Sequence, residues 1–344
     1  MNIQKLTPAY KDYLWGGNKL KEKYGKTTDL SPLAESWELS FHKDGECLFE
    51  NEIPISKSVS ERALGKNLSD FPLFPVMIKF IDAAKDLSIQ VHPNDDYALL
   101  HENSLGKTEM WYVVEAEEGA GIYLGFNRDV TKEEYRQAIA ENRITELLNF
   151  YKVKAGECYF IPAGTVHAIG AGCLICEIQQ NSNVTYRVYD YGRLGKDGKA
   201  RELHIEKALD VSELKMFTPR KADALLGASR YFTAREITVS DDAELCADEG
   251  SFHCVTCVSG TGYTERKKIS LGDSFFIPAG YGSYALRGDM TVILTEIRKY
   301  RIVSSDDGSE RLLLIDDLGR IVASGANRSS LLSSVNMTES DVEL

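Results

Sequence analysis

The sequence of 344 residues lacks any long apolar stretch, and no run approaches the ~20 consecutive apolar residues that a membrane-spanning helix needs. Its start, Met1 to Leu6, also lacks the apolar core of a secretion signal. Positive charge is scarce, because 40 Lys and Arg residues face 52 Asp and Glu residues and the net charge is −12. Broad nucleic-acid binding needs a basic surface. We therefore expect a cytoplasmic protein without a membrane or nucleic-acid partner, in which any site for a phosphorylated ligand requires a local basic cluster.

The cysteines give no sign of a disulfide framework, because the chain has seven of them and no export signal. Two pairs, Cys173/Cys176 and Cys254/Cys257, have the C-x-x-C spacing of zinc ligands. Both pairs lie in runs that we predict to be β-strands, where residues three apart point to opposite faces and cannot hold one ion. We predict reduced thiols buried in the core.

The pattern of apolar residues favours a mostly β protein. Short runs rich in Val, Ile, Tyr and Phe alternate with Gly, Pro, Asn and Asp turns, which is typical of an antiparallel sandwich or barrel. Helices are expected only as a small insertion near 131–149, where Thr131 and Glu134 have the spacing of a capping box, and near 206–215.

A nine-residue segment occurs twice. GECYFIPAG at 156–164 returns as GDSFFIPAG at 272–280, at a constant offset, so the chain contains a duplicated unit. We predict an N-terminal domain over 1–217, a second domain over 218–299, and extra strands with a polar tail over 300–344 that is partly disordered after Gly325.

Only the first copy carries a histidine three residues past its last glycine: His167 stands there, and Ser283 stands in the second copy. Gln90 and His92 share one side of a predicted strand, and Glu109 opens another. Two histidines and a carboxylate leave open positions around a catalytic metal, and the Gln90 amide oxygen adds a weaker fourth ligand. The remaining histidines lack such neighbours, and we treat them as surface or structural residues: His42, His101, His204 and His253.

The spacing from Gly156 through Pro162 and Gly164 to His167 matches the second cupin motif, and Gln90-x-His92 with Glu109 is a variant of the first. We therefore expect two cupin-type (jelly-roll) β-barrels, of which the first binds a metal and the second does not.

Longer motifs make the chain resemble class I mannose-6-phosphate isomerases in their shorter bacterial form, over roughly residues 5–298. The residues that carry this resemblance are Tyr13–Gly17, Glu35–Ser40, Ser88–Pro93, Lys107-x-Glu109, His167–Ala168 and Asn181–Arg187. The resemblance implies interconversion of mannose 6-phosphate and fructose 6-phosphate through a cis-enediol. It further implies one Zn²⁺ per chain, bound by Gln90, His92, Glu109 and His167, with Arg187 as the catalytic arginine.

Two features depart from that family. Gly106 stands where longer members have a histidine before the lysine, so a proton-transfer role for that histidine cannot operate here. The segment after about residue 300 is also longer than in the short family form, and its purpose is not explained by the sequence.

Other residues are candidates for contact with the sugar phosphate. Lys79 places a charge inside an apolar strand, which costs energy unless it is paired or faces a cavity; Ser88 is a further contact, and Trp15 would form a wall. The proton-transferring base stays open between a metal-bound water, the carboxylates Glu38 and Glu177, and the amine of Lys107, and Glu38 is also expected to contact substrate.

Two alternatives to the isomerase are an iron dioxygenase, because two histidines and a carboxylate also suit Fe(II), and a non-catalytic sugar-binding regulator. Gln90, Lys107 and Arg187 favour the isomerase, and the complete ligand set argues against a regulator. The expected partner is a small sugar phosphate, and we expect a monomer or a weak homodimer.

The repeat provides a first test. His167→Ala should abolish zinc binding and turnover and leave most of the fold, because it removes a metal ligand. Ser283→Ala, the matched change in the second copy, should do neither. Zinc content, activity and circular dichroism measure these effects. An equal loss of activity in both variants would contradict a single working barrel.

Overall fold

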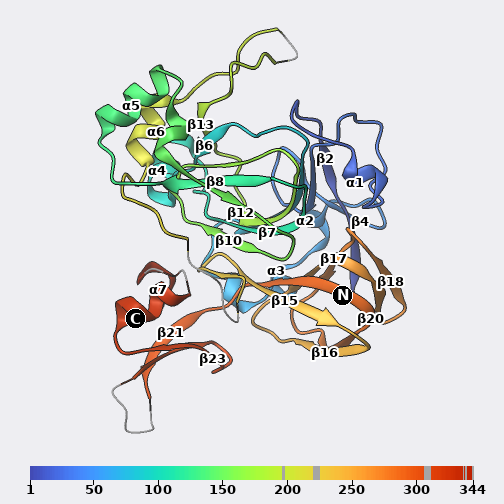
Figure 1. Cartoon of the computed structure of the whole chain (residues 1–344). Coiled ribbons are helices and arrows are strands. Elements are labelled where there is room, and N and C mark those ends of the chain that lie inside the picture. Colours follow the sequence, from blue (N-terminus) through green and yellow to red (C-terminus); the bar gives the residue numbers. More distant parts are fainter. Residues whose placement is uncertain (196–197, 220–224, 306–310, 336, 338, 343–344) are drawn as a thin grey trace.

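The computed structural model describes residues 1–344 except 196–197, 220–224, 306–310, 336, 338 and 343–344. It contains two packed β-structures, with helices on the first of them and a small sheet near the C-terminus (Figure 1). This architecture is mostly β with few helices, as the sequence predicts. None of the helices in the described ranges is long and apolar enough to cross a membrane.

The first barrel consists of two antiparallel sheets. The six-stranded sheet has the order β10 (Cys158–Ile161), β7 (Glu109–Ala116), β12 (Cys173–Gln180), β5 (Val76–Ala83), β3 (Glu35–Leu39) and β2 (Ala9–Lys11). The five-stranded sheet has the order β13 (Tyr186–Tyr189), β6 (Ile89–Val91), β11 (His167–Ile169), β8 (Gly121–Phe126) and β9 (Leu148–Lys152). Trp111 and Ile175 of the first sheet pack with Ile122 and Leu124 of the second in one buried cluster. This core holds the two sheets face to face.

Short helices cover the outside of the five-stranded sheet. In the part of the chain that the structure describes, the helices are α1 (Lys19–Glu22), α2 (Ile55–Ser58), α3 (Glu61–Leu64), η1 (Lys66–Leu68), α4 (Asp95–Glu102), α5 (Lys132–Ala140), η2 (Ile144–Leu147), α6 (Ile205–Val211), α7 (Arg328–Ser334) and η3 (Glu339–Asp341). The capping box of α5 is confirmed, because Thr131 Oγ1 accepts from the Glu134 amide at 3.1 Å and Glu134 Oε2 accepts from the Thr131 amide at 2.8 Å. Tyr135 of α5 and Leu209 of α6 pack on Val91 of the sheet.

The second barrel is built around a nine-stranded sheet. Its main path is β14 (Gly227–Ala228), β15 (Thr233–Val239), β20 (Gly282–Glu296), β17 (His253–Thr264), β19 (Ser274–Ile277), β1 (Gln4–Thr7) and β4 (Leu48–Phe49). β16 (Asp242–Ala247) pairs with β20, and β18 (Lys267–Ser270) pairs with β17. The N-terminal strands β1 and β4 thus extend the sheet of the second barrel, which departs from a simple division at residue 217.

The duplicated segment occupies equivalent places in the two barrels. β10 pairs with β7, and β19 pairs with β17 in the same way. Ile161 lies opposite Glu109, and its repeat partner Ile277 lies opposite His253. The second barrel therefore has His253 at the position that Glu109 takes in the first.

The predicted packing of the C-x-x-C cysteines is confirmed. Cys173 belongs to the cluster between the two sheets of the first barrel, and Cys176 belongs to the cluster between the barrels. Cys254 lies between the barrels, whereas Cys257 lies inside the second. Residues three apart in a strand face opposite sides, so neither pair converges on an ion.

The C-terminal segment forms a three-stranded sheet of β21 (Tyr300–Ser304), β22 (Leu312–Asp316) and β23 (Ile321–Gly325). The prediction of disorder after Gly325 is wrong for α7. Asn327 caps this helix by accepting from the Ser330 amide at 2.9 Å, and Leu331 and Leu332 are buried in one cluster with Leu314. The N-cap and the two buried leucines stabilise the helix in this Ser-rich stretch.

Glu38 faces the second barrel. Its carboxylate pairs with the buried Lys26 at 2.6 Å, and Lys26 also donates to the carbonyl of Gly272 in the turn before β19, at 2.6 Å. Ser36 Oγ donates to the same carboxylate at 2.5 Å. Burial raises the pKa of Glu38, and Lys26 opposes that shift. The pair joins β3 of the first barrel to the second barrel.

This buried pair generates a stability prediction. Lys26→Met should lower the stability of the protein by about 3–5 kcal/mol, because it leaves the Glu38 carboxylate buried without its cation. Lys66→Met is the matched control, since Lys66 and its partner Glu249 have side chains that are 75% and 68% exposed, and it should change little. Thermal unfolding measures both. Equal shifts in the two variants would mean that the Lys26–Glu38 pair has no special role.

Candidate metal centre

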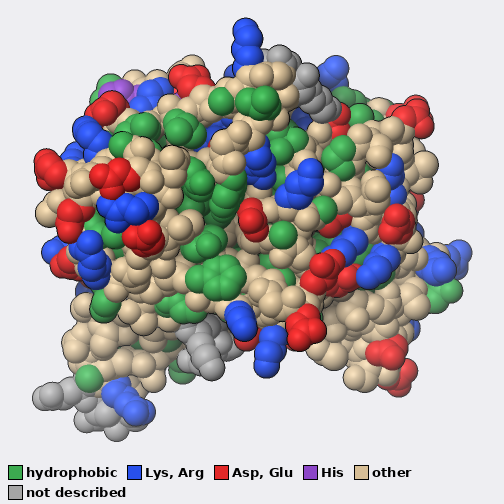
Figure 2. All heavy atoms as spheres, turned by 45° about the horizontal axis from the view of Figure 1, so that its top comes forward, with side chains coloured by type: hydrophobic (Ala, Val, Ile, Leu, Met, Phe, Trp, Pro, Cys, Tyr) green, Lys and Arg blue, Asp and Glu red, His purple; other side chains and the backbone are tan. Residues whose placement is uncertain are grey.

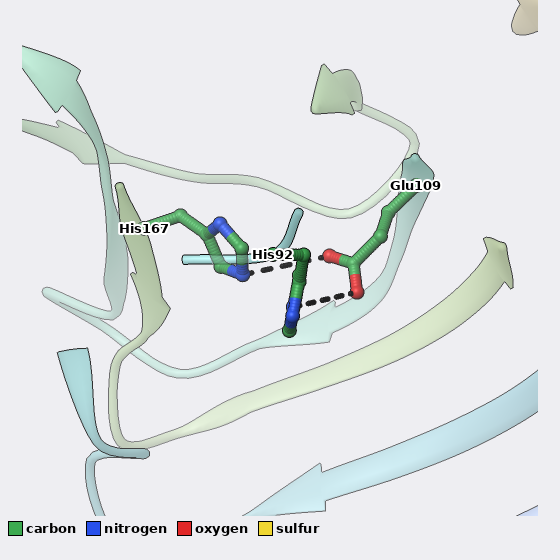
Figure 3. Close-up of side chains that lie close together, drawn as sticks. All are labelled: His92, Glu109 and His167. Carbon is green, nitrogen blue, oxygen red and sulfur yellow. Dashed lines mark ion pairs between the residues drawn. The ribbon is translucent and has the colours of Figure 1, made fainter. Parts of the chain in front are cut away.

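Three side chains meet inside the first barrel (Figure 3). Glu109 Oε1 lies 3.2 Å from His92 Nε2, and Glu109 Oε2 lies 3.6 Å from His167 Nε2. All three residues are buried, and their potential ligand atoms lie within 4.8 Å of one another. Within the described ranges, this is the one such group of three or more His, Cys, Asp and Glu side chains.

Strand pairing brings these residues together from distant parts of the chain. His167 opens β11 and pairs with Gln90 of β6, and His92 follows β6 directly. Glu109 opens β7 in the facing sheet. Because the two sheets pack over one core, the ends of these strands meet inside the barrel.

Both imidazoles are oriented for metal binding. His92 Nδ1 donates to the carbonyl of Val184 at 2.8 Å, and His167 Nδ1 donates to the carbonyl of Thr165 at 2.8 Å. These bonds place the proton on Nδ1 and leave the Nε2 lone pairs directed at the shared carboxylate. Burial and the Lys107 charge lower the pKa of His92 to about 3, and burial also lowers the pKa of His167. Both rings are therefore neutral at pH 7, as ligands must be.

The carboxylate also fits a cation. Burial opposes the ionisation of Glu109, but the Lys107 cation outweighs it and holds the pKa of Glu109 well below its usual range. Its Oε2 is buried with no hydrogen-bond donor among the described residues, and a buried anion with an unused lone pair is costly unless a cation meets it. Lys107 Nζ contacts Glu109 Oε1 and lies 3.2 Å from His92 Nε2. Two neutral imidazoles and an ionised carboxylate suit a divalent metal with open positions.

Gln90 lies between a metal-site histidine and the predicted catalytic arginine. It pairs with His167 on one side and with Arg187 of β13 on the other, and directly paired residues point to the same face of a sheet. Gln90 Nε2 is 3.4 Å from His167 Nε2. A half-turn of the amide would direct its oxygen to the triad, so the position suits a fourth ligand.

Gly106 excludes the histidine of the longer family members. A Cβ at this position would lie 2.5 Å from the carbonyl carbon of Asn94 and 2.6 Å from the amide nitrogen of Asp95. The Gly106 amide donates to Asp95 Oδ1 at 2.8 Å, and the Lys107 amide donates to the carbonyl of Pro93 at 3.0 Å. This close backbone contact holds Lys107 beside the triad.

A cavity of about 270 Å³ opens next to the triad. Of the expected substrate contacts, Trp15, Lys79, Ser88, Lys107 and Arg187 all line it, together with Gln90. In Figure 2, hydrophobic side chains and Lys and Arg side chains surround a central hollow on the face shown.

Glu38 does not line this cavity, and the expectation that it contacts substrate is not met. It points to the opposite side of β3, where it pairs with Lys26. Glu35, three residues earlier, lines the cavity instead. Alternation along β3 places Glu35 and Glu38 on opposite faces, but the sequence does not reveal which face is the inner one. Glu35 and Arg201 are cavity residues that sequence reasoning missed.

Lys79 lies between two carboxylates. Its Nζ is 3.5 Å from Glu35 Oε2 and 3.6 Å from Glu177 Oε2. Burial acts against the charge on Lys79, but Glu35 and Glu177 outweigh it and raise its pKa. Burial and the nearby Glu109 raise the pKa of Glu177 to about 7. Trp111 Nε1 donates to Glu177 Oε1 at 2.8 Å, and its ring packs edge-on against His167.

The second barrel fills the equivalent region with ion pairs. His253 Nε2 lies 3.3 Å from Glu296 Oε2, and its Nδ1 is hydrogen-bonded to the Tyr284 hydroxyl at 2.8 Å. Arg298 and Arg235 also pair with Glu296, at 2.5 and 2.6 Å. The guanidinium groups of Arg235 and Arg298 here neutralise the buried carboxylate.

Comparison with known proteins identifies related chains. The family model "Phosphomannose isomerase type I, catalytic domain" matches residues 3–120, and "Mannose-6-phosphate isomerase, cupin domain" matches residues 224–297. A probable mannose-6-phosphate isomerase of Bacillus subtilis, GmuF, is 36% identical over 303 residues, which cover 82% of this chain and 95% of that protein. A mannose-6-phosphate isomerase of Streptococcus mutans is 35% identical over 299 residues, covering 81% and 93%.

A crystal structure of the mannose 6-phosphate isomerase from Bacillus subtilis has the same fold, with a TM-score of 0.79 and 31% identity. The match covers 86% of this chain and 100% of that chain. The present chain thus contains residues without a counterpart there, and the matched family models end at residue 297.

Proposed function

The chain belongs to the type I mannose-6-phosphate isomerase family, and on this premise we propose that it interconverts mannose 6-phosphate and fructose 6-phosphate with one Zn²⁺ per chain. The observation that carries the proposal is the buried group of His92, Glu109 and His167, which Gln90 and Lys107 separate from a neighbouring cavity lined by further cationic side chains. These residues and Gln90 would hold the ion. A bound zinc ion supplies positive charge that polarises the oxygens of the open-chain sugar.

We assign proton transfer to Glu177. The aldose–ketose exchange moves a proton from C2 to C1 of the open-chain sugar, while the proton on O2 shifts to O1. A base whose pKa is near the working pH can both take and return a proton. Glu177 has a pKa of about 7 and lines the cavity, where Trp111 holds one of its oxygens. Of the candidates from the sequence, Glu38 lies outside the cavity and Lys107 is held against Glu109.

Arg187 is assigned to the developing enediolate. It is a cavity residue beside Gln90, and its Nε is buried with no hydrogen-bond partner in the described structure. Its Nη1 donates to the carbonyl of Glu202 at 2.9 Å, which fixes the guanidinium plane. A permanently charged donor held in place before the reaction stabilises negative charge as it forms.

The isomerase is favoured over the two alternatives. The relatives reported above have isomerase names, which favours this activity over an iron dioxygenase. A non-catalytic regulator would not need the complete ligand set. We further propose a cytoplasmic location, which seven free cysteines support; a monomer or weak homodimer stays a prediction.

The activity is tested by a coupled assay for fructose 6-phosphate formed from mannose 6-phosphate. Turnover should stop after chelation of the metal and return when Zn²⁺ is added, because the proposed ion supplies the charge that polarises the sugar oxygens. Oxygen uptake in an electrode chamber is the control for dioxygenase chemistry and should be absent. Zinc-loaded protein that does not turn over mannose 6-phosphate would refute the proposal.

The role of Glu177 predicts a pH dependence. A base acts in its ionised form, so kcat/KM should fall as the pH drops below the pKa of Glu177, which is about 7. A cation on Glu109 removes part of the repulsion that raises this pKa, so the acid limb should lie at or below pH 7. Glu177→Gln should lower kcat about 10²- to 10⁴-fold without loss of zinc.

Glu35→Gln is the matched control, because Glu35 is the other carboxylate beside Lys79. The Glu35→Gln enzyme should show the same fall of kcat/KM at low pH as the wild type. A Glu177→Gln enzyme with normal kcat would remove this residue from proton transfer.

A further inference from the structure

A second charged cluster lies at the Arg187 side of the cavity, away from the metal ligands. Asp190 follows β13, and its side chain is 6% exposed. Arg201 donates from Nε to Asp190 Oδ2 at 2.7 Å and from Nη2 to Oδ1 at 2.5 Å. Arg193 Nη2 donates to the same Oδ1 at 2.5 Å. One buried carboxylate thus orients two guanidinium groups.

The two arginines differ in what they face. Arg193 also donates to the carbonyls of Asp86 and Asp190, and its guanidinium lies over the Tyr191 ring. Its donors are thereby directed to the protein. Arg201 lines the cavity together with Arg187. A fork held on one edge by a carboxylate presents its other edge for a ligand.

Three guanidinium groups gather at this end. Arg187, Arg193 and Arg201 lie around the buried Asp190, the exposed Glu202 is near Arg187, and Asp86 is beside Arg193, where its carboxylate accepts from the Ala171 amide. Burial first, and then the charge of Arg201, lowers the pKa of Arg187. An anion placed between Arg187 and Arg201 would relieve this repulsion.

The opposite end of the cavity disfavours a phosphate group. Lys79 is flanked by Glu35 and Glu177, so its charge is already compensated. A phosphate dianion there would meet two carboxylates. Lys79 is therefore better placed to contact the sugar hydroxyls. The phosphate group fits better beside Arg187 and Arg201 than beside Lys79.

We propose that Arg201, oriented by Asp190, binds the phosphate group of the substrate and gives the enzyme its preference for sugar phosphates over free sugars. The inference rests on the proposed function, because it places the phosphate of the same sugar. Arg201 is a binding residue and Asp190 is a positioning residue. The sugar then extends from Arg201 past Arg187 to the metal ligands, which orients its C1 and C2 carbons toward Glu177.

The test compares KM and kcat for mannose 6-phosphate in Arg201→Gln, Arg201→Lys and Asp190→Asn. Arg201→Gln should raise KM about 10- to 100-fold, the loss expected for charge-assisted hydrogen bonds, with a smaller effect on kcat. The inhibition constant of inorganic phosphate should rise by a similar factor. Arg201→Lys should recover part of the affinity, and Asp190→Asn should raise KM because Arg201 loses its support.

The control is Arg136→Gln, since Arg136 forms an exposed ion pair with Glu206 and neither residue lines the cavity; its KM should match the wild type. Zinc content and thermal unfolding establish that each variant is folded. An unchanged KM and phosphate inhibition in folded Arg201→Gln would overturn the inference while leaving the isomerase intact.

Calorimetric titration of the zinc-loaded wild-type protein and of Arg201→Gln with inorganic phosphate separates the two claims. Phosphate binding that depends on Arg201, in a protein without isomerase activity, would support the phosphate site and refute the proposed function. Isomerase turnover together with equal phosphate binding by the wild type and Arg201→Gln would support the proposed function and refute the phosphate site.

Discussion

The site depends on an ionised carboxylate that is buried between two neutral imidazoles. Glu109 is fully buried, and the His92 and His167 rings reach it with their unprotonated nitrogens. A charge in such a place is tolerated only when cations or donors meet it. Lys107 provides part of that compensation, and the unpartnered Glu109 Oε2 leaves room for a metal. The backbone carbonyls of Val184 and Thr165 fix both rings before any ion arrives.

The two barrels neutralise a buried carboxylate in different ways. In the second barrel, His253 takes the place of Glu109, and the buried carboxylate comes from Glu296. Arg235 and Arg298 neutralise it from within the protein. Unlike a metal ion, these guanidinium groups are covalently attached to the protein and cannot coordinate a substrate. The second barrel packs against the first through a shared apolar cluster, while the first barrel keeps a buried carboxylate oxygen, Glu109 Oε2, that has no hydrogen-bond donor among the described residues.

That His92, Glu109 and His167 meet could be predicted from the sequence, because strand alternation and a repeat mark both histidines. Gln90 and His92 share a face in any strand, and the repeat marks His167 by its replacement with Ser283. The face of β3 that carries Glu38 could not be predicted, since alternation shows only that Glu38 and Glu35 lie on opposite faces. The pairing of β1 with β19 is likewise a contact between the ends of the chain that local patterns do not encode. Arg201 was missed because its importance comes from Asp190, which the fold brings to it.

We propose that one metal ion binds in the first barrel and none in the second. X-ray diffraction from crystals grown with zinc, measured on both sides of the zinc absorption edge, would locate every bound zinc ion. We expect a single anomalous peak per chain, in contact with Gln90, His92, Glu109 and His167. A peak beside His253 and Glu296, or a zinc ion bound away from Glu109, would contradict it.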